Sequence, residues 1–374
     1  MENKKNILTA IILYPLSVIY SLIIYIRNRL FDYNIILGTK EFDIPIISVG
    51  NITVGGTGKT PHIEYLVKIL KENYKIATLS RGYRRKTKGY VLATETSNFF
   101  EIGDEPRQIK NKFPELVVSV DEKRVRGVTK LIDTFKEDLD AILLDDAFQH
   151  RSIKPGLSIL LVDYTQPMFD DQMLPYGRLR ENRHEKRRAN IIVVTKTPRN
   201  LKPIEKRILV KNLNIYPYQN LYFTTMTYGS LKPVFGGIGE KSIFDKLSKG
   251  SLSLLVFTGI GRPESMLDYL KKEISQDLNY LRFPDHHNFT KADLEKIRKE
   301  FEQLSSKNKL IITTEKDATR LTDITHKEII SDLPVVYLPM NITFLGDDEK
   351  DFDNQIVNYV KKNKGNNQLH SKSD

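Results

Sequence analysis

A glycine-rich stretch near the N-terminus constrains the fold more than any other feature of this 374-residue chain. It follows a short apolar segment at 44–49 and precedes an expected helix at 61–72. The backbone N–H groups of such a loop, together with the positive end of a helix, bind phosphate oxygens. A lysine at its end reaches the β- and γ-phosphates of a nucleotide, and the next hydroxyl ligates Mg²⁺. The expected nucleotide-binding residues are Gly55, Gly56, Thr57, Gly58, Lys59 and Thr60.

The loop departs from the general pattern G-x-x-x-x-G-K-[ST] at its first position. That pattern requires glycine at position 53, where this chain has Thr53. The nearest upstream glycine is Gly50, which indicates a loop longer than the common one. A glycine-rich turn before an ordinary helix is the alternative. The order of strand, loop, Lys-Thr and helix nevertheless favours a phosphate-binding loop.

Composition narrows the classes of partner. The chain contains no cysteine, so a disulfide framework and a thiolate metal site are excluded. Its net charge of +11 favours an anionic partner. Nucleic acid is disfavoured because no nucleic-acid-binding motif is present, tryptophan is absent and aromatic residues do not alternate with basic ones. An acidic membrane surface or a phosphorylated ligand fits the charge better.

Residues 7–26 form an uncharged apolar run with basic residues on both sides. About 20 apolar residues are enough to cross a bilayer, and the absence of a small-residue cleavage site argues against a removable signal peptide. Three interpretations stay open: a membrane-spanning helix, a helix lying in one leaflet, and a buried core helix. The phosphate loop that follows is expected in the cytoplasm, where the nucleotide is.

The rest of the chain predicts an α/β fold. Apolar segments at 44–49, 75–79, 116–120, 141–144, 157–162 and 190–194 alternate with helical patterns, as in a parallel sheet. We expect a P-loop NTPase-like parallel-sheet domain with an N-terminal hydrophobic helix, and a second, smaller α/β domain joined by β-strand linkers. The expected boundaries are 1–30 for the membrane-associating helix, 31–218 for the P-loop domain, 219–363 for the second domain with its linker strands, and 364–374 for a disordered tail.

The sequence also predicts one exposed loop and one helix cap. Residues 178–188 are heavily basic and are expected to form an exposed loop. Thr290 precedes a helical pattern and is a plausible N-cap.

A pair of carboxylates follows the apolar segment at 141–144. Asp145 and Asp146 would stand at the carboxyl end of a strand, where ligands bind in open α/β sheets. In phosphate-loop proteins a carboxylate at this place holds Mg²⁺ directly or through water. A helix cap or a solvated turn is the alternative. Thr60, Asp145 and Asp146 are therefore the expected metal shell.

Candidates for acid–base chemistry come from both predicted domains. In the motif GDEP at 103–106, Asp104 or Glu105 is either a general base or a helix cap. In FPDHHNF at 283–289, His286 suits the orientation of a carboxylate base. Adjacent histidines rarely chelate one ion, so we do not expect His286 and His287 to form a metal pair.

Other polar residues are weaker candidates. Tyr83 follows a strand and can be presented to the same site. Arg124 and Arg126 suit a phosphorylated substrate, although they equally suit the solvated start of a helix. Arg180 and Glu181 are candidates for contact with nucleotide or metal.

Taken in order, these motifs resemble the tetraacyldisaccharide 4′-kinase family of lipid A biosynthesis. The matching motifs are SVGN…GGTGKTP, SRGY, GDEP, DDAFQH, LPYGRLRE, FPDH and TEKD, over residues 48–317. Single motifs are common, but the ordered set is highly specific, and the longer glycine loop is typical of this family. The chain departs at Ala147 and Phe148, where Gly-Leu or Gly-Met is frequent, and at Tyr176, where a small residue is common.

The resemblance implies transfer of the ATP γ-phosphoryl group to the 4′-hydroxyl of an acylated glucosamine disaccharide 1-phosphate, which forms lipid IVA. Asp104 is the implied general base, assisted by His286, and ATP and Mg²⁺ are the implied cofactors. Arg180 and Glu181 would lie beside the nucleotide. The residues implied on the substrate side are Tyr83, Arg124, Arg126 and His150.

The resemblance also implies a place in the cell. The implied reaction would occur at the cytoplasmic face of the inner membrane of a Gram-negative-type bacterium. The expected partners are the disaccharide substrate and the inner-membrane lipid surface, without nucleic acid, and we expect a monomer. The alternative function is a membrane-anchored P-loop NTPase switch that acts on a protein partner.

Overall fold

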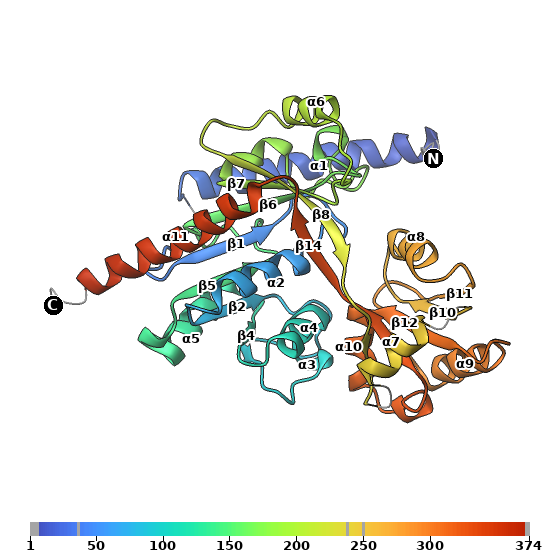
Figure 1. The fold of residues 1–374 in the computed structure, drawn as a ribbon. Coiled ribbons are helices and arrows are strands. Elements are labelled where there is room, and N and C mark those ends of the chain that lie inside the picture. Colours follow the sequence, from blue (N-terminus) through green and yellow to red (C-terminus); the bar gives the residue numbers. More distant parts are fainter. Residues whose placement is uncertain (1–6, 36–37, 237–238, 249–250, 371–374) are drawn as a thin grey trace.

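In the computed structural model, the chain forms a large and a small α/β lobe joined by two long strands (Figure 1). The structure describes all residues except 1–6, 36–37, 237–238, 249–250 and 371–374. The predicted α/β fold is confirmed. Each of the six strands predicted before residue 195 is present, with bounds that agree within two residues.

The large lobe is built on a nine-stranded sheet of order β14-β8-β7-β6-β1-β5-β2-β4-β3. Neighbours from β8 to β4 are parallel, and the edge strands β14 and β3 are antiparallel to theirs. The strands are β1 Ile46–Gly50, β2 Ile76–Ser80, β3 Val91–Leu92, β4 Val117–Val120, β5 Ala141–Asp145, β6 Leu157–Asp163, β7 Ile191–Thr195, β8 Asn220–Tyr228 and β14 Met340–Phe344. Their central members are apolar throughout because helices cover both faces.

One face of this sheet packs against α2, α4 and α11, and the other packs against α5 and α6. These faces form separate apolar clusters because successive strand residues point to opposite sides. The α-helices of the large lobe are α2 Lys59–Leu70, α3 Phe99–Ile102, α4 Asp104–Lys112, α5 Arg124–Phe135, α6 Pro203–Leu213 and α11 Asp348–His370. Its short 3₁₀ segments are Lys136–Asp138, Met168–Asp170 and Arg183–Arg188.

The small lobe has a five-stranded sheet of order β11-β10-β12-β13-β9. Its strands are β9 Lys232–Pro233, β10 Ser253–Thr258, β11 Leu278–Arg282, β12 Lys309–Thr314 and β13 Val335–Leu338. Its helices are α7 Glu240–Ser248, α8 Glu264–Glu273, α9 Lys291–Glu302, α10 Glu315–Asp323 and a 3₁₀ turn at Lys327–Ile329. The Thr290 side chain accepts from the Asp293 N–H in a capping box, so the predicted N-cap of α9 is confirmed.

The two connecting strands belong to the large sheet. β8 pairs with β7, and β14 pairs with β8, before the chain continues to or from the small lobe (Figure 1). After β14, α11 returns to the large lobe and buries Phe352, Ile356 and Val360 in its core. Residues 219–363 are therefore not one continuous domain, because both ends of that range complete the large lobe.

The predicted disordered tail needs a correction. The helix α11 continues past Lys364 to His370. Lys364 Nζ lies 2.5 Å from Asp140 Oδ1 of the large lobe, an ion pair that favours the helical path. The last four residues lie outside the described part of the chain.

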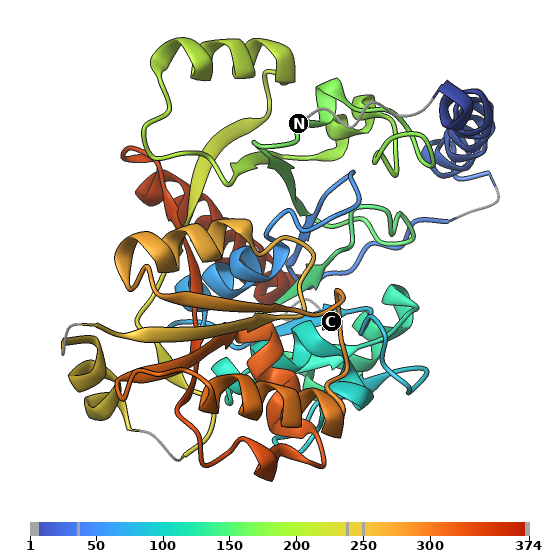
Figure 2. The same cartoon turned by 90° about the vertical axis from the view of Figure 1, so that its right-hand side faces the viewer.

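The helix α1, Ile7–Asp32, lies at the periphery of the large lobe (Figure 2). Its outward side is apolar: Ile12, Ile19 and Ile23 are 58%, 56% and 58% exposed. Its inward side carries the buried polar side chains of Ser17 and Asn28. The stretch Ala10–Asp32 is long and apolar enough to cross a membrane, and 6% of its 18-residue apolar window is buried. The buried-core-helix interpretation is therefore wrong.

Candidate active site

The phosphate loop stands at the centre of the large sheet, between β1 and α2. Gly58 adopts a left-handed backbone with φ of 87° and directly precedes α2, so glycine is required at this turn. Two residues at the end of β7 hold the loop from the other side. Thr195 Oγ1 donates to Thr57 O at 2.9 Å, and Lys196 Nζ donates to Gly56 O at 2.5 Å. The loop is thus braced before any ligand is bound.

The two irregularities of the motif have separate causes. A Cβ at Gly50 would lie 2.7 Å from Phe148 Cβ, so this glycine permits the close approach of the segment after β5. Thr53 pairs with Leu179 in an antiparallel bridge, and Val54 N donates to the Arg178 carbonyl at 2.8 Å. Extended, paired backbone does not require glycine. Thr53 therefore belongs to the approach to the loop.

Asp145 stands beside the loop because β5 is the neighbour of β1. In the parallel pairing of β1 with β5, Val49 lies opposite Asp145, and the Asp145 side chain is buried. Burial, followed by the negative charges of Glu105 and Asp146, raises the pKa of Asp145 to about 7. Within the described part of the chain, Asp145 Oδ1 accepts no hydrogen bond. A buried carboxylate oxygen of this kind is suited to a cation.

Asp146 follows β5 and forms ion pairs with two basic residues. Its backbone is left-handed, with φ of 47°. Lys59 Nζ lies 3.6 Å from Asp146 Oδ1, and Arg180 Nη1 lies 3.2 Å from Asp146 Oδ2. Burial raises the pKa of Asp146, but Lys59 and Arg180 outweigh it and hold the pKa below its usual value. The structure thus brings together the predicted residues Lys59, Asp145, Asp146 and Arg180.

This donor set fits Mg²⁺ bound together with phosphate. Mg²⁺ takes one or two carboxylates and completes its shell with phosphate oxygens and water. Among the described residues, no group of three or more His, Cys, Asp or Glu side chains is arranged as a metal cage. The oxygens of Thr60, Asp145 and Asp146 suit an ion that arrives with a nucleotide.

A second group of polar side chains joins the two lobes at Asp104. Asp104, the first residue of α4, accepts from His286 Nδ1 at 2.9 Å and from Arg320 Nη2. Lys316 Nζ lies 3.3 Å from His286 Nε2 on the other side of the imidazole ring. Burial favours the neutral carboxyl, but the bonds from His286 and Arg320 hold the pKa of Asp104 well below its usual range. Asp104 is therefore an ionised, tightly oriented carboxylate.

Glu105 places the two groups near each other. Glu105, the neighbour of Asp104, lies close enough to Asp145 to raise its pKa. Glu105 also pairs with Lys316 of the small lobe at 3.4 Å. His286 has a left-handed backbone with φ of 58°, and its ring Nδ1 reaches Asp104 of the large lobe.

Sequence reasoning missed Arg320. It lies on α10, its side chain is 1% exposed, and it bridges Asp104 and Asp317. A buried arginine between two lobes has no local sequence signature. The spacing of three between Asp317 and Arg320 on one helix face was the available signal.

The four predicted substrate-side residues do not form one group. Tyr83 is 59% exposed and packs edge-on against the His286 ring at 5.4 Å. Arg124 is buried and donates to the Asp145 carbonyl at 3.2 Å, and burial lowers its pKa to about 10. His150 lies close to Arg124, and burial, followed by that positive charge, lowers its pKa to about 4. Arg126 instead forms a bidentate pair with Asp121, at 2.7 and 2.8 Å.

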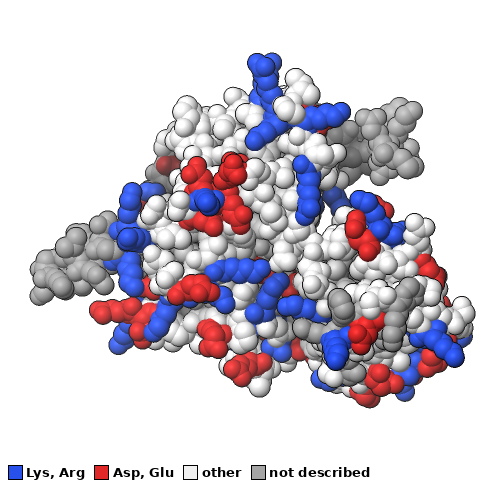
Figure 3. Space-filling model, in the orientation of Figure 1, with Lys and Arg blue, Asp and Glu red and all other residues white. Residues whose placement is uncertain are grey.

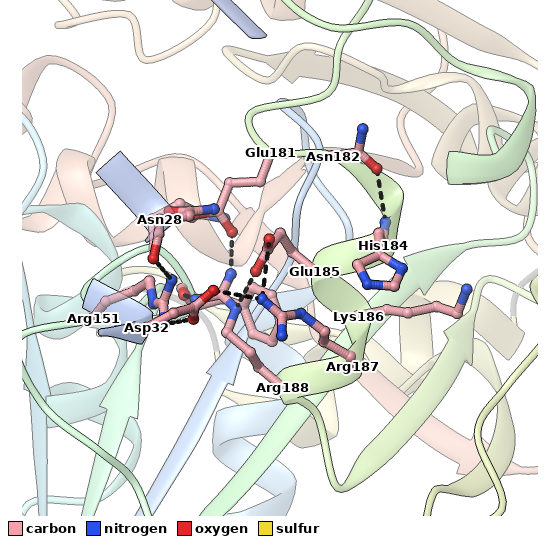
Figure 4. Close-up of polar contacts among 12 residues, drawn as sticks. Asn28, Asp32, Arg151, Glu181, Asn182, His184, Glu185, Lys186, Arg187 and Arg188 are labelled. Carbon is pink, nitrogen blue, oxygen red and sulfur yellow. Dashed lines mark hydrogen bonds and ion pairs between the residues drawn. The ribbon is translucent and has the colours of Figure 1, made fainter. Parts of the chain in front are cut away.

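The Glu181 side chain contacts α1. Its carboxylate is 1% exposed and pairs with Arg27 of α1 at 2.7 Å and with Arg188 (Figure 4). The expectation of an exposed loop at 178–188 is correspondingly wrong, because Glu181, Glu185 and Lys186 are buried. The charges of this segment neutralise one another and those of α1 and therefore do not require solvent.

Comparisons with known proteins agree with this geometry. The family model described as tetraacyldisaccharide-1-P 4′-kinase matches residues 9–361. A tetraacyldisaccharide 4′-kinase of Bacteroides thetaiotaomicron is 46% identical over 369 residues, which cover 97% of this chain and 96% of the relative. A tetraacyldisaccharide 4′-kinase of Flavobacterium johnsoniae is 44% identical over 352 residues, which cover 94% of this chain and 97% of the relative.

A solved structure shares the fold. The crystal structure of "apo" form LpxK from Aquifex aeolicus in complex with ATP superposes with a TM-score of 0.70 at 27% identity. The superposition covers 93% of this chain and 98% of the other. The match of the family model and the identity to these relatives extend over nearly the whole chain. The chain therefore belongs to the tetraacyldisaccharide-1-phosphate 4′-kinase family.

Proposed function

We propose that the cleft between the lobes transfers the γ-phosphoryl group of ATP to the 4′-hydroxyl of a tetraacyldisaccharide 1-phosphate. The observation that carries this proposal is the position of Asp104, an oriented carboxylate from the large lobe held by His286 and Arg320 of the small lobe. A hydroxyl acceptor needs such a group opposite the phosphate donor. The P-loop on the other side of the cleft is the donor site.

The proposed reaction divides the residues into two roles. Residues 55–60 would hold the triphosphate, and Thr60, Asp145 and Asp146 would hold the Mg²⁺, which would supply positive charge to the transferred group. Asp104 orients the 4′-hydroxyl and accepts its proton as the new O–P bond forms and the bond from the γ-phosphorus to ADP breaks. His286 acts through Asp104 by fixing the direction of the carboxylate.

Tyr83 suits the acceptor side of the site, whereas Arg124 has a supporting role beside the metal-binding edge. Tyr83 is exposed next to His286, where it can stack on a sugar. Arg124 supports the end of β5 beside Asp145. Arg126 is already paired with Asp121, so we assign it the weaker role of positioning the helix start.

We further propose that the protein works at the cytoplasmic face of the inner membrane. An outward face of exposed isoleucines on α1 has no advantage in water and is suited to lipid. On the face shown in Figure 3, basic and acidic side chains are intermixed over both lobes and do not form one basic field. The apolar face of α1 is therefore the membrane determinant in this proposal. Both lobes of the site come from one chain, so a monomer is sufficient.

The direct test is incubation of the protein with γ-labelled ATP, Mg²⁺ and a tetraacyldisaccharide 1-phosphate in detergent micelles. Label is expected on the lipid at the 4′ position. An NTPase switch would instead release labelled phosphate without the acceptor. Unlabelled lipid in the presence of folded, ATP-binding protein would refute the proposed reaction.

A further inference from the structure

The segment that carries Arg180 lies between the phosphate loop and α1. Toward the loop, its backbone pairs with the residues that lead into the glycines: Val54 N donates to Arg178 O at 2.8 Å, and Arg180 N donates to Ile52 O at 2.7 Å. The Arg180 guanidinium reaches Asp146 from the same segment. A shift of this segment would therefore move both the approach to the loop and the partner of Asp146.

The opposite side of the segment is held by α1. Tyr20 Oη donates to the Arg180 carbonyl at 3.0 Å. Ser17 Oγ donates to Met173 O at 3.0 Å and accepts from Tyr176 N at 2.8 Å. These contacts come from the inward face of the helix, opposite the exposed isoleucines.

Ion pairs strengthen this contact (Figure 4). Glu181 follows Arg180 in sequence. Arg27 of α1 donates to one oxygen of the Glu181 carboxylate at 2.7 Å, and Arg188 donates to the other oxygen. Near the end of α1, Asp32 accepts from Arg151 at 2.6 Å and from Arg187 at 2.8 Å. Figure 4 shows Asp32, Arg151 and Glu181 close to Arg187 and Arg188, between the helix and residues 181–188.

The burial of Glu181 makes the Arg27 contact important. Exposed ion pairs contribute about 0–1 kcal/mol, whereas removing one partner of a buried charge leaves the other uncompensated. Glu181 is 1% exposed, and Arg188 would still pair with one of its oxygens, but loss of Arg27 would leave the other oxygen without its ion pair to α1. A helix that merely anchors the chain needs its apolar outer face and has no need of an ordered polar inner face.

We propose that α1 is a structural part of the nucleotide site. Arg27 is a positioning residue: through Glu181 it holds Arg180 on Asp146, so ATP binding requires α1 to be seated on residues 178–181. The inference rests on the proposed nucleotide site and is independent of the identity of the acceptor.

The test compares two substitutions on the same helix in the full-length protein in detergent micelles. Arg27→Gln removes the inward contact, and Ile23→Asn changes an outward residue that is 58% exposed. Equilibrium binding of a fluorescent ATP analogue with Mg²⁺ is measured without acceptor. We expect Arg27→Gln to weaken binding on the order of 10- to 100-fold, as is typical for outer partners of a metal–phosphate site. Arg27→Lys should recover most of the loss, and Ile23→Asn should bind like the wild type.

A double-mutant cycle identifies the route of the effect. If Arg27 acts through Arg180, Arg27→Gln should add little to the loss caused by Arg180→Gln. Multiplicative losses, or wild-type ATP affinity in Arg27→Gln, would overturn the proposal. If Arg27→Gln does not fold, as judged by thermal unfolding, Tyr20→Phe serves in its place, since it removes the bond to the Arg180 carbonyl while keeping the ring. Unaltered ATP affinity in Tyr20→Phe would then overturn the proposal. Because ATP binding is measured without acceptor, failure of the proposed lipid transfer would leave this result interpretable.

Discussion

Asp104 illustrates how the environment of a single residue limits its chemistry. A carboxylate with a depressed pKa is a weak base, so Asp104 cannot remove a proton from a sugar hydroxyl in advance of the reaction. Phosphoryl transfer passes through a loose transition state in which the hydroxyl becomes acidic late. Orientation therefore matters more than basicity, and the bonds from His286 and Arg320 supply it.

The orienting role of His286 predicts a selective loss. His286→Gln should lower kcat by about 100-fold, since a misdirected catalytic group costs roughly that much, and should leave ATP affinity unaltered. The matched control is His287→Gln, because His287 pairs with Asp293 inside the small lobe at 2.9 Å. Steady-state kinetics on both variants would check this, and equal losses in the two would contradict the orienting role.

The raised pKa of Asp145 predicts a pH dependence for Mg²⁺. Mg²⁺ binds the carboxylate, and Asp145 is protonated below a pKa of about 7. The affinity for Mg²⁺-ATP should therefore rise with pH through 7 and level off above it. Asp145→Asn should weaken binding and flatten this dependence. The measurement is ATP-analogue binding at fixed Mg²⁺ from pH 5.5 to 8.5, and a flat wild-type profile would contradict the assignment.

Sequence motifs predicted some of the individual site residues and missed others. Asp104, Lys59 and Asp146 lie at ends of elements and His286 lies in the loop after β11, all in recognisable motifs, so their convergence could be expected. Arg320 could not be, because its partner is 216 residues away in sequence. The sequence motif places Glu181 with Arg180 as a nucleotide contact, but in the structure the Glu181 carboxylate pairs with Arg27 of α1.

Among the elements, β1 shows how close packing fixes a glycine. Gly50→Ala would place a Cβ 2.7 Å from Phe148 Cβ and 2.8 Å from its backbone nitrogen. Such overpacking should lower the free energy of unfolding by about 2 kcal/mol. Gly56→Ala is the control, since its added Cβ meets no atom within 4 Å. Denaturant unfolding of both would check this, and equal stability would contradict the close approach.

The element α1 should bind membranes through its outward face. Ile19→Asn combined with Ile23→Asn removes two apolar side chains, each worth about 1.5–3 kcal/mol when fully buried. Partitioning onto anionic phospholipid vesicles should fall by more than about 10-fold, with ATP binding retained. Leu247→Asn on α7, at a residue 41% exposed, is the control. Unchanged co-sedimentation with vesicles would contradict a lipid-facing α1.

Elements with strong periodicity were predictable from sequence, while their assignment to lobes was not. The βαβ segments of the large lobe and the cap of α9 follow from apolar patterns and local chemistry. The spacing of Phe352, Ile356 and Val360 on one helix face was a local signal for α11, but its docking on the large lobe depends on long-range packing. The basic segment 178–188 resembles a solvated loop in sequence because its ion-pair partners on α1, Arg27 and Asp32, are distant in the chain.

At the scale of the whole molecule, the site is complete when the lobes meet. Phe99 N, Arg107 and Lys112 of the large lobe all contact carboxylates of α10 in addition to the Asp104 group. The connecting strand β8 is linked to the phosphate loop through His62 of α2. The His62 ring donates to Gly58 O of the loop at 2.7 Å and accepts from the hydroxyl of Thr224 on β8. Movement of the small lobe would thus be felt at both the donor and the acceptor side, and closure would exclude water.

The central claim is that Asp104, held across the lobes, serves the acceptor opposite the P-loop. The most direct measurement is single-turnover transfer of γ-labelled phosphate to the lipid acceptor by wild-type protein and Asp104→Asn, with ATP binding measured in parallel. We expect Asp104→Asn to slow transfer on the order of 10²- to 10⁴-fold while it binds ATP like the wild type. Transfer at nearly the wild-type rate would contradict the account.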